Sequence, residues 1–67
     1  LLEALTPREL ELLHLIDAGL TNQQLADRLY VSVATVKWHL YNLYNKLGVA
    51  NRSSAIAKSR SLSLISH

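Results

Sequence analysis

The feature that most constrains the fold of this chain is a series of closely spaced signals for the starts and ends of helices. The stretch TPRE, beginning at Thr6, combines an N-cap threonine, a proline at the first helical position and a glutamate three residues after the cap. Gly19 stands where a C-cap would end that helix. A second capping box, TNQQ, begins at Thr21. Signals at this spacing leave room only for short helices joined by tight turns.

Continued along the chain, these signals predict an all-α fold, a four-helix bundle containing a helix-turn-helix. Ser32 is the next N-cap, Gly48 ends the helix that follows, and Asn51 caps a fourth helix. We expect helices at about residues 7–18, 22–29, 33–47 and 52–63. No alternation with a period of two is present, which argues against strands. The second and third helices are about three residues apart, the spacing of a helix-turn-helix. The expected inward positions of the last helix are Ala55, Ile56 and Leu62.

Composition limits the kinds of protein that this chain can be. Its 67 residues suffice for one domain with a small core. It has no cysteine, which excludes disulfides and thiolate zinc sites, and no apolar run near the roughly 20 residues that span a bilayer. These absences favour a cytoplasmic protein. Because the chain also has no methionine, we expect residues 1–67 to be a single domain of a longer protein.

The sequence offers no arrangement that carries catalysis. His14, His39 and His67 lie on different segments. Patterns for a catalytic triad, paired carboxylates, a glycine-rich phosphate loop or a metal site are missing. We therefore expect neither an enzyme nor a bound metal or cofactor.

Charge is distributed unevenly along the chain. Residues 1–27 hold all five acids and one base, Arg8, whereas residues 28–67 hold six bases and no acid. A segment of net charge +6 beside one of −4 indicates a face suited to a polyanion, although a short chain can also be lopsided by chance.

The third helix separates a core side from an outer side of unusual composition. At about 100° per residue, apolar residues spaced 4, 3 and 4 apart form a narrow seam from Val36 to Leu47. Opposite the seam lie Trp38, Tyr41 and Asn45, with Lys37 and Tyr44 on one flank and Thr35, His39, Asn42 and Lys46 on the other.

This outer side has no carboxylate, whereas an ordinary solvated helix mixes glutamate with lysine. A helix fits the major groove of DNA, where lysine can donate to guanine and an aromatic ring can meet the thymine methyl group. We therefore interpret Trp38 as a groove-facing residue. The alternative is that Trp38 packs on the fourth helix or on another domain.

The stretch from Leu5 to Arg52 resembles the LuxR-type (GerE-like) DNA-binding domain of bacterial transcription regulators. It reads LTPRELELLHLIDAGLTNQQLADRLYVSVATVKWHLYNLYNKLGVANR. The family pattern is LTxRExxVLxLxAxGxSNKEIAxxLxISxxTVKxHxxNIxxKLGVxxR. Several motifs in a fixed order make this more specific than a lone helix-turn-helix pattern. The part LYNLYNKLGVANR is most similar to the large ATP-binding regulators that resemble the maltose regulon activator.

The resemblance implies the C-terminal domain of a regulator that binds double-stranded promoter DNA, with the third helix in the major groove. It also implies a homodimer formed through the last helix, and RNA polymerase as a further partner. The positions that match base-facing residues are Lys37, Trp38 and Tyr41. Those that match residues at the DNA backbone are Thr21, Asn22, Ser32, Thr35, His39, Asn42 and Lys46. The dimerisation positions are Ser53 and Ala57.

Several of these residues have a second interpretation. Thr21 and Ser32 also serve as N-caps. Lys46 is also an ordinary lysine near a helix C-terminus, where the helix dipole favours it. Arg52 could reach a phosphate or bind an intramolecular partner such as Glu9. For Lys37 and His39 the alternative is a plain exposed side chain.

Two other functions stay open at this point. Region 4 of a bacterial sigma factor has a similar pattern, although the KLGV motif and the capped fourth helix argue against it. An interaction module could instead use Trp38, Tyr41 and Tyr44 as a protein-binding patch, because aromatic residues are enriched at interface hot spots. The dependence of binding on salt separates these functions, because phosphate contacts weaken steeply as salt rises.

Overall fold

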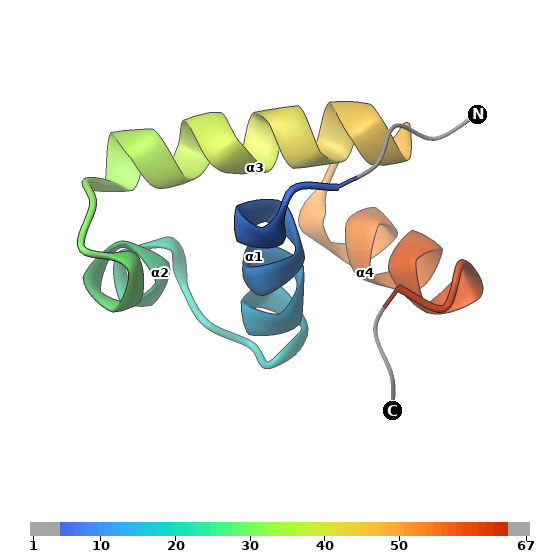
Figure 1. Ribbon diagram of the computed structural model, residues 1–67, viewed down its shortest axis with the longest axis horizontal. Helices are drawn as coiled ribbons and strands as arrows, with labels where there is room; N and C mark the ends of the chain where they lie inside the picture. Colours follow the sequence, from blue (N-terminus) through green and yellow to red (C-terminus); the bar gives the residue numbers. More distant parts are fainter. Residues whose placement is uncertain (1–4, 65–67) are drawn as a thin grey trace.

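The computed structural model describes residues 5–64, which form four helices and no strand. Glu3 and His67 lie outside this range. The helices are α1 (Pro7–Asp17), α2 (Asn22–Leu29), α3 (Val33–Leu47) and α4 (Arg52–Ser61). In Figure 1, α3 runs along the top, with α1, α2 and α4 below it. The predicted all-α fold with a helix-turn-helix made by α2 and α3 is confirmed. Within the described range, no helix has both the length and the apolar character needed to cross a membrane.

The core lies beneath α3, where the other helices meet its apolar seam. α2 packs on α3, whereas α1 packs on both α3 and α4. The predicted seam of α3 is confirmed, because all four of its residues are buried. The largest side chains with almost no exposed surface are Leu12, Leu13 and Ile16 of α1, Leu25 of α2, and Val36, Leu43 and Leu47 of α3.

All four predicted N-caps are present. Thr6, Thr21, Ser32 and Asn51 each accept a hydrogen bond from the backbone N–H three residues later. The first two are complete capping boxes, in which the third residue of the helix also accepts from the N–H of the cap. The chain therefore enters every helix with its first free N–H groups partly satisfied.

The predicted end of α4 was wrong. The helix ends at Ser61 rather than at 63, and Leu62 is 39% exposed instead of inward. The cause is Ser63, whose φ of 59° reverses the chain. The N–H of Leu64 then donates to the carbonyl of Ser59 at 2.8 Å. Leu64, rather than Leu62, is the partly buried residue that packs against the core.

The turn of the helix-turn-helix contains an unusual residue. Tyr30 ends α2 in the left-handed conformation, with φ 58° and ψ 43°. Its N–H donates to the carbonyl of Ala26, and its side chain is 95% exposed. A residue with a Cβ atom in this conformation costs about 1–2 kcal/mol relative to a right-handed one. Because the ring is almost fully exposed, burial of its side chain provides little compensation.

We therefore expect Tyr30→Gly to raise the free energy of unfolding by about 0.5–1 kcal/mol, because relief of this strain exceeds the greater flexibility of glycine in the unfolded chain. In a domain of this size, 1 kcal/mol corresponds to a shift of roughly 4–8 °C in Tm, which thermal denaturation can measure.

Tyr30→Ala is the matched control, because alanine loses the ring and keeps the Cβ atom. We expect its Tm to stay near that of the wild type. An equal gain in both variants would assign the effect to the ring rather than to the backbone.

Candidate nucleic-acid interface

The outer side of α3 presents the three predicted base-facing residues to solvent. Lys37 is exposed, and Trp38 and Tyr41 are 61% and 64% exposed. Trp38 is therefore not buried against α4, which was one of the two alternatives, and packing on another domain stays a prediction. Its ring lies edge-on to that of His39, with the centroids 5.1 Å apart. Lys37 forms no ion pair within residues 5–64, so its ammonium group is available to a ligand.

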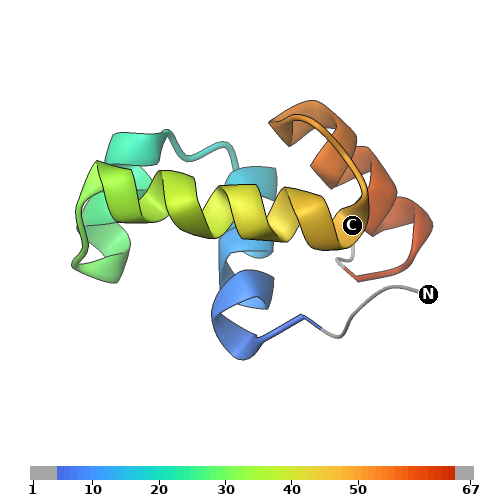
Figure 2. The same cartoon turned by 90° about the horizontal axis from the view of Figure 1, so that it is seen from above.

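Two grooves border this outer side. Figure 2 shows that α1 begins on one side of α3, while α2 and α4 begin on the other. The α2-side groove, of about 550 Å³, includes Thr21, Asn22, Lys37, Tyr41, Tyr44 and Arg52. The α1-side groove, of about 470 Å³, includes Thr6, Arg8, Trp38, His39, Asn42 and Lys46. The two flanks expected from the helical wheel therefore correspond to two separate grooves.

In the α2-side groove, Arg52 joins the start of α4 to the start of α2. Its Nη1 donates to the carbonyl of Leu20, and its Nη2 donates to Oδ1 of Asn22 at 3.1 Å. The sequence suggested Glu9 as the intramolecular partner of Arg52, and this prediction was wrong. Because the Asn22 oxygen accepts from Arg52, its amide NH₂ is the group left to donate outward at the start of α2.

Three hydroxyl residues of the predicted DNA-backbone set lie at helix starts. The hydroxyl of Thr21 accepts from the N–H of Gln24 at 3.2 Å, and that of Ser32 accepts from the N–H of Thr35 at 3.1 Å. The Ser32 and Thr35 hydroxyls are 3.0 Å apart. Capping is therefore confirmed, and phosphate contacts by these residues stay a prediction.

In the α1-side groove, Lys46 is engaged by an acid. Its Nζ lies 2.8 Å from Oε1 of Glu9, and the two side chains are only 22% and 8% exposed. The same oxygen accepts from the N–H of Thr6 at 2.8 Å. Lys46 thus ties the last turn of α3 to the start of α1. Its phosphate contact stays a prediction, but its charge is already offset by Glu9.

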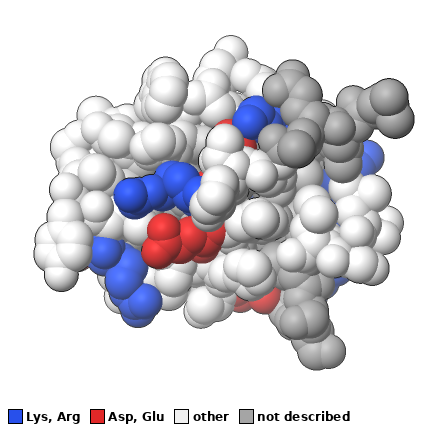
Figure 3. All heavy atoms as spheres, in the orientation of Figure 1, with Lys and Arg blue, Asp and Glu red and all other residues white. Residues whose placement is uncertain are grey.

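The uneven charge along the sequence is partly cancelled in the fold. Acids of α1 pair with bases from the second half of the chain, Glu9 with Lys46 and Asp17 with Arg60. The face seen in Figure 3 accordingly shows acidic and basic side chains next to each other rather than a uniform basic patch. Two of the bases that the sequence assigns to a polyanion-binding face are therefore paired with acids of α1.

The predicted dimerisation residues lie apart from both grooves. Ser53 and Ala57 are exposed on α4, one turn apart. Two residues of the α1-side groove, Arg8 and Glu9, were missed as site residues, because their place beside α3 depends on how α1 crosses it. The signal that could have identified Arg8 is its position as the one base in an otherwise acidic segment. Within residues 5–64, no three His, Cys, Asp or Glu side chains gather as a metal site.

Comparison with known proteins identifies the family. A model of the bacterial regulatory proteins of the luxR family matches residues 3–59. The chain belongs to this luxR family. The match favours a LuxR-family domain over region 4 of a sigma factor. The similarity to the ATP-binding subgroup of LuxR-family regulators stays a prediction.

Individual LuxR-family relatives agree with this assignment. The chain is 57% identical over 56 residues to the probable transcriptional regulatory protein SgaR of Hyphomicrobium methylovorum, covering 84% of this chain and 26% of that protein. The response regulator ChrA of a heme-sensing two-component system is 51% identical, with a TM-score of 0.90, over 94% of this chain and 31% of that one. The transcription factor GerE is 35% identical, with a TM-score of 0.84, over 92% of each chain.

The chain thus spans about a quarter of SgaR and a third of ChrA, but nearly all of GerE. Its fold, with α2 and α3 as the helix-turn-helix, is the one found in GerE. The chain is a LuxR-family DNA-binding domain of a transcription regulator.

Within this LuxR-family domain, the Glu9–Lys46 pair couples stability to pH. Burial by itself raises the pKa of the Glu9 carboxyl. Hydrogen bonds from Lys46 and Thr6, together with the charge of Lys46, outweigh burial and hold the pKa below its ordinary value of 4.5. The stabilisation is therefore complete above the unfolded pKa and is lost as the pH falls through the lower folded pKa.

We expect Glu9→Gln to lower the free energy of unfolding at pH 7 by about 1–2 kcal/mol, because the Lys46 ammonium loses its charged partner. The variant should also lose less stability than the wild type as the pH falls below about 4.5. Urea denaturation at a series of pH values measures both effects.

Glu11→Gln is the matched control. Glu11 is about half exposed and lies 4.0 Å from Arg8, so its removal should change stability by less than about 0.5 kcal/mol. If Glu9→Gln kept the acid sensitivity of the wild type, the assignment of that sensitivity to Glu9 would be wrong.

Proposed function

We propose that this LuxR-family domain binds promoter DNA in a sequence-specific manner, with α3 in the major groove. The observation that carries the proposal is the outer side of α3. It presents a free lysine and two exposed aromatic rings without a carboxylate, between two grooves that each contain polar side chains. We call this outer side of α3, with Lys37, Trp38 and Tyr41, the ridge. Its shape and chemistry match a major groove that is bordered on each side by phosphates.

The residues on the ridge are the ones that would contact bases. Lys37 can donate to guanine O6 and N7, and the rings of Trp38 and Tyr41 can pack on thymine methyl groups. Tyr41 and Lys37 line the α2-side groove, whereas Trp38 lines the α1-side groove. The three side chains therefore span the width of the ridge, and successive base pairs would meet different members of the set.

Phosphate contacts would come from both flanks and set the register on the duplex. Thr21 and Asn22 lie at the start of α2, and Ser32 and Thr35 lie at the start of α3. The free N–H groups and the dipole at a helix start favour phosphate. His39, Asn42 and Lys46 complete the set on the other flank of α3.

The wider role follows from the relatives. SgaR is named as a probable transcriptional regulatory protein, and ChrA is a response regulator. By analogy, residues 1–67 would be the C-terminal DNA-binding domain of a longer cytoplasmic regulator with a binding rather than a catalytic role. Ser53 and Ala57 on α4 would join two copies on half-sites about one helical turn apart. RNA polymerase is a further proposed partner of that regulator.

A protein-binding function of the same surface is the second candidate. The exposure of Trp38 and Tyr41 supports it, because aromatic residues dominate interface hot spots. An apolar contact of this kind would bind with little dependence on salt, whereas DNA binding weakens as salt rises.

The experiment that tests the proposal is selection from a randomised pool of DNA duplexes, followed by titration of the enriched duplex between 50 and 200 mM salt. We expect a short motif to be enriched and its affinity to fall steeply as salt rises. The same experiment is repeated with a tethered dimer, since one domain alone would make few contacts with DNA. Absence of enrichment and of salt-dependent binding in both forms would reject the proposal in favour of a protein partner.

We expect Lys37→Ala to weaken binding to the enriched duplex by about 1–3 kcal/mol and to relax the base preference at one position. The reason is the loss of donors to a guanine edge. Lys58→Ala is the charge-matched control, because Lys58 is exposed on α4 and lines neither groove. Competition with single-base variants of the duplex is the measurement. Equal losses on every sequence would reassign Lys37 to the phosphate backbone.

A further inference from the structure

We propose that Arg8, near the start of α1, contacts a DNA phosphate on the side of the major groove opposite to α2. The inference rests on the proposed function, because it concerns the same docking of α3. It extends that function to α1, which packs on α3 and α4 in the core.

The position of Arg8 is the first argument. It lines the α1-side groove together with Trp38, His39 and Asn42 of α3. Figure 2 shows the start of α1 emerging from beneath α3 on the side away from the start of α2. If α3 lies in the major groove, the phosphates of one strand pass the α2-side groove and those of the other strand pass the α1-side groove. Arg8 then lies beside the second strand.

The state of the other cation in this groove is the second argument. Lys46 is 2.8 Å from the nearly buried Glu9 and would have to leave a charged partner to bind a phosphate. His39, Asn42 and Asn45 offer polar groups without a fixed positive charge. The groove therefore holds one cation that is free of a buried acid, and that cation is Arg8.

The third argument is that the ion pair of Arg8 within the protein is weak. Within residues 5–64 its ion-pair partner is Glu11, with Nε 4.0 Å from Oε1, and the two side chains are 46% and 53% exposed. An exposed pair at this distance contributes little, so a phosphate can replace the carboxylate. A guanidinium group suits this exchange, because its planar fork matches two phosphate oxygens.

The phosphate contacts on the two flanks of α3 would then come from different helices. On the α2 side, Lys37 and the Asn22 amide face the groove, and Arg52 holds Asn22 in place. On the α1 side, Arg8 supplies the positive charge, because Lys46 is already paired with Glu9. Glu11 in turn would weaken DNA binding slightly, because it competes with phosphate for Arg8.

The first test measures the affinity of the full 67-residue chain for the enriched duplex between 50 and 200 mM salt. Arg8→Ala should lower the slope of log K against log salt by about 1. Across this fourfold range of salt, its affinity should fall roughly threefold less than that of the wild type. Glu11→Gln should bind more tightly than the wild type, and this gain should be smaller in the Arg8→Ala background, an outcome that a merely structural role of Arg8 would not produce. Thermal denaturation of each variant checks that it is folded.

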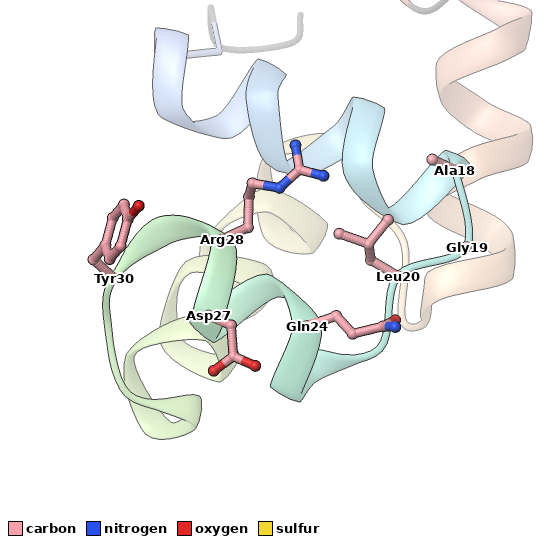
Figure 4. Close-up of a pocket in the computed structure, with 7 residues that line it drawn as sticks. All are labelled: Ala18, Gly19, Leu20, Gln24, Asp27, Arg28 and Tyr30. Atoms are coloured by element: carbon pink, nitrogen blue, oxygen red, sulfur yellow. The ribbon is translucent and has the colours of Figure 1, made fainter.

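Arg28→Ala is the matched control, since it removes the same charge. Arg28 lies on α2 in a separate depression formed with the end of α1, shown in Figure 4, which contains no residue of α3. We expect this variant to keep the slope of the wild type.

The second test replaces single phosphates of the duplex by neutral methylphosphonates. One position on the strand facing α1 should weaken the wild type and leave Arg8→Ala unaffected. If the wild type binds in a salt-dependent manner and Arg8→Ala keeps both the slope and the sensitivity to every phosphate, the inference is wrong and the proposed function stands. If neither the chain nor its tethered dimer binds DNA in a salt-dependent manner, both are wrong.

Discussion

One carboxylate oxygen at the start of α1 joins that helix to the last turn of α3. Oε1 of Glu9 accepts from the N–H of Thr6, which closes the capping box, and from Nζ of Lys46, which lies in the last turn of α3. Both distances are 2.8 Å. A single acceptor thus completes the start of one helix and attaches the end of another to it. Because the contact is largely shielded from water, loss of either partner would leave a poorly solvated charge.

This contact limits what the outer side of α3 can present. It fixes the C-terminal half of α3 across the start of α1, while Arg52 fixes the start of α2 through Asn22 and Leu20. The ridge that contains Trp38 and Tyr41 is therefore held at both flanks by polar contacts and from below by the apolar seam. A rigid ridge loses little conformational entropy on binding, which favours specific recognition.

Local patterns in the sequence were enough to predict most of the fold. The four caps and the seam of α3 follow from interactions within three or four residues, which the sequence displays directly. The end of α4 was wrong because the left-handed turn at Ser63 has no glycine to signal it. The partners of Lys46 and Arg52 could not be predicted, because they lie 37 and 30 or more residues away in the chain. Such contacts depend on how α1 crosses α3, which no local pattern specifies. Arg8 was missed as a site residue for the same reason.

The charges that remain free around α3 bear on how this LuxR-family domain would act. Pairing with Glu9 and Asp17 removes Lys46 and Arg60 from the bases that a sequence count would assign to DNA. Lys37, Arg52 and the weakly held Arg8 are then the cations of the two grooves that have no buried acid as a partner. The electrostatic contribution to DNA affinity grows with the number of neutralised phosphates. One copy of the domain would therefore bind DNA weakly at physiological salt. Two linked copies raise the effective concentration of the second for its half-site, with no new contact to DNA. The small number of such cations favours the proposal that α4 joins two copies, with sequence selection left to Lys37, Trp38 and Tyr41.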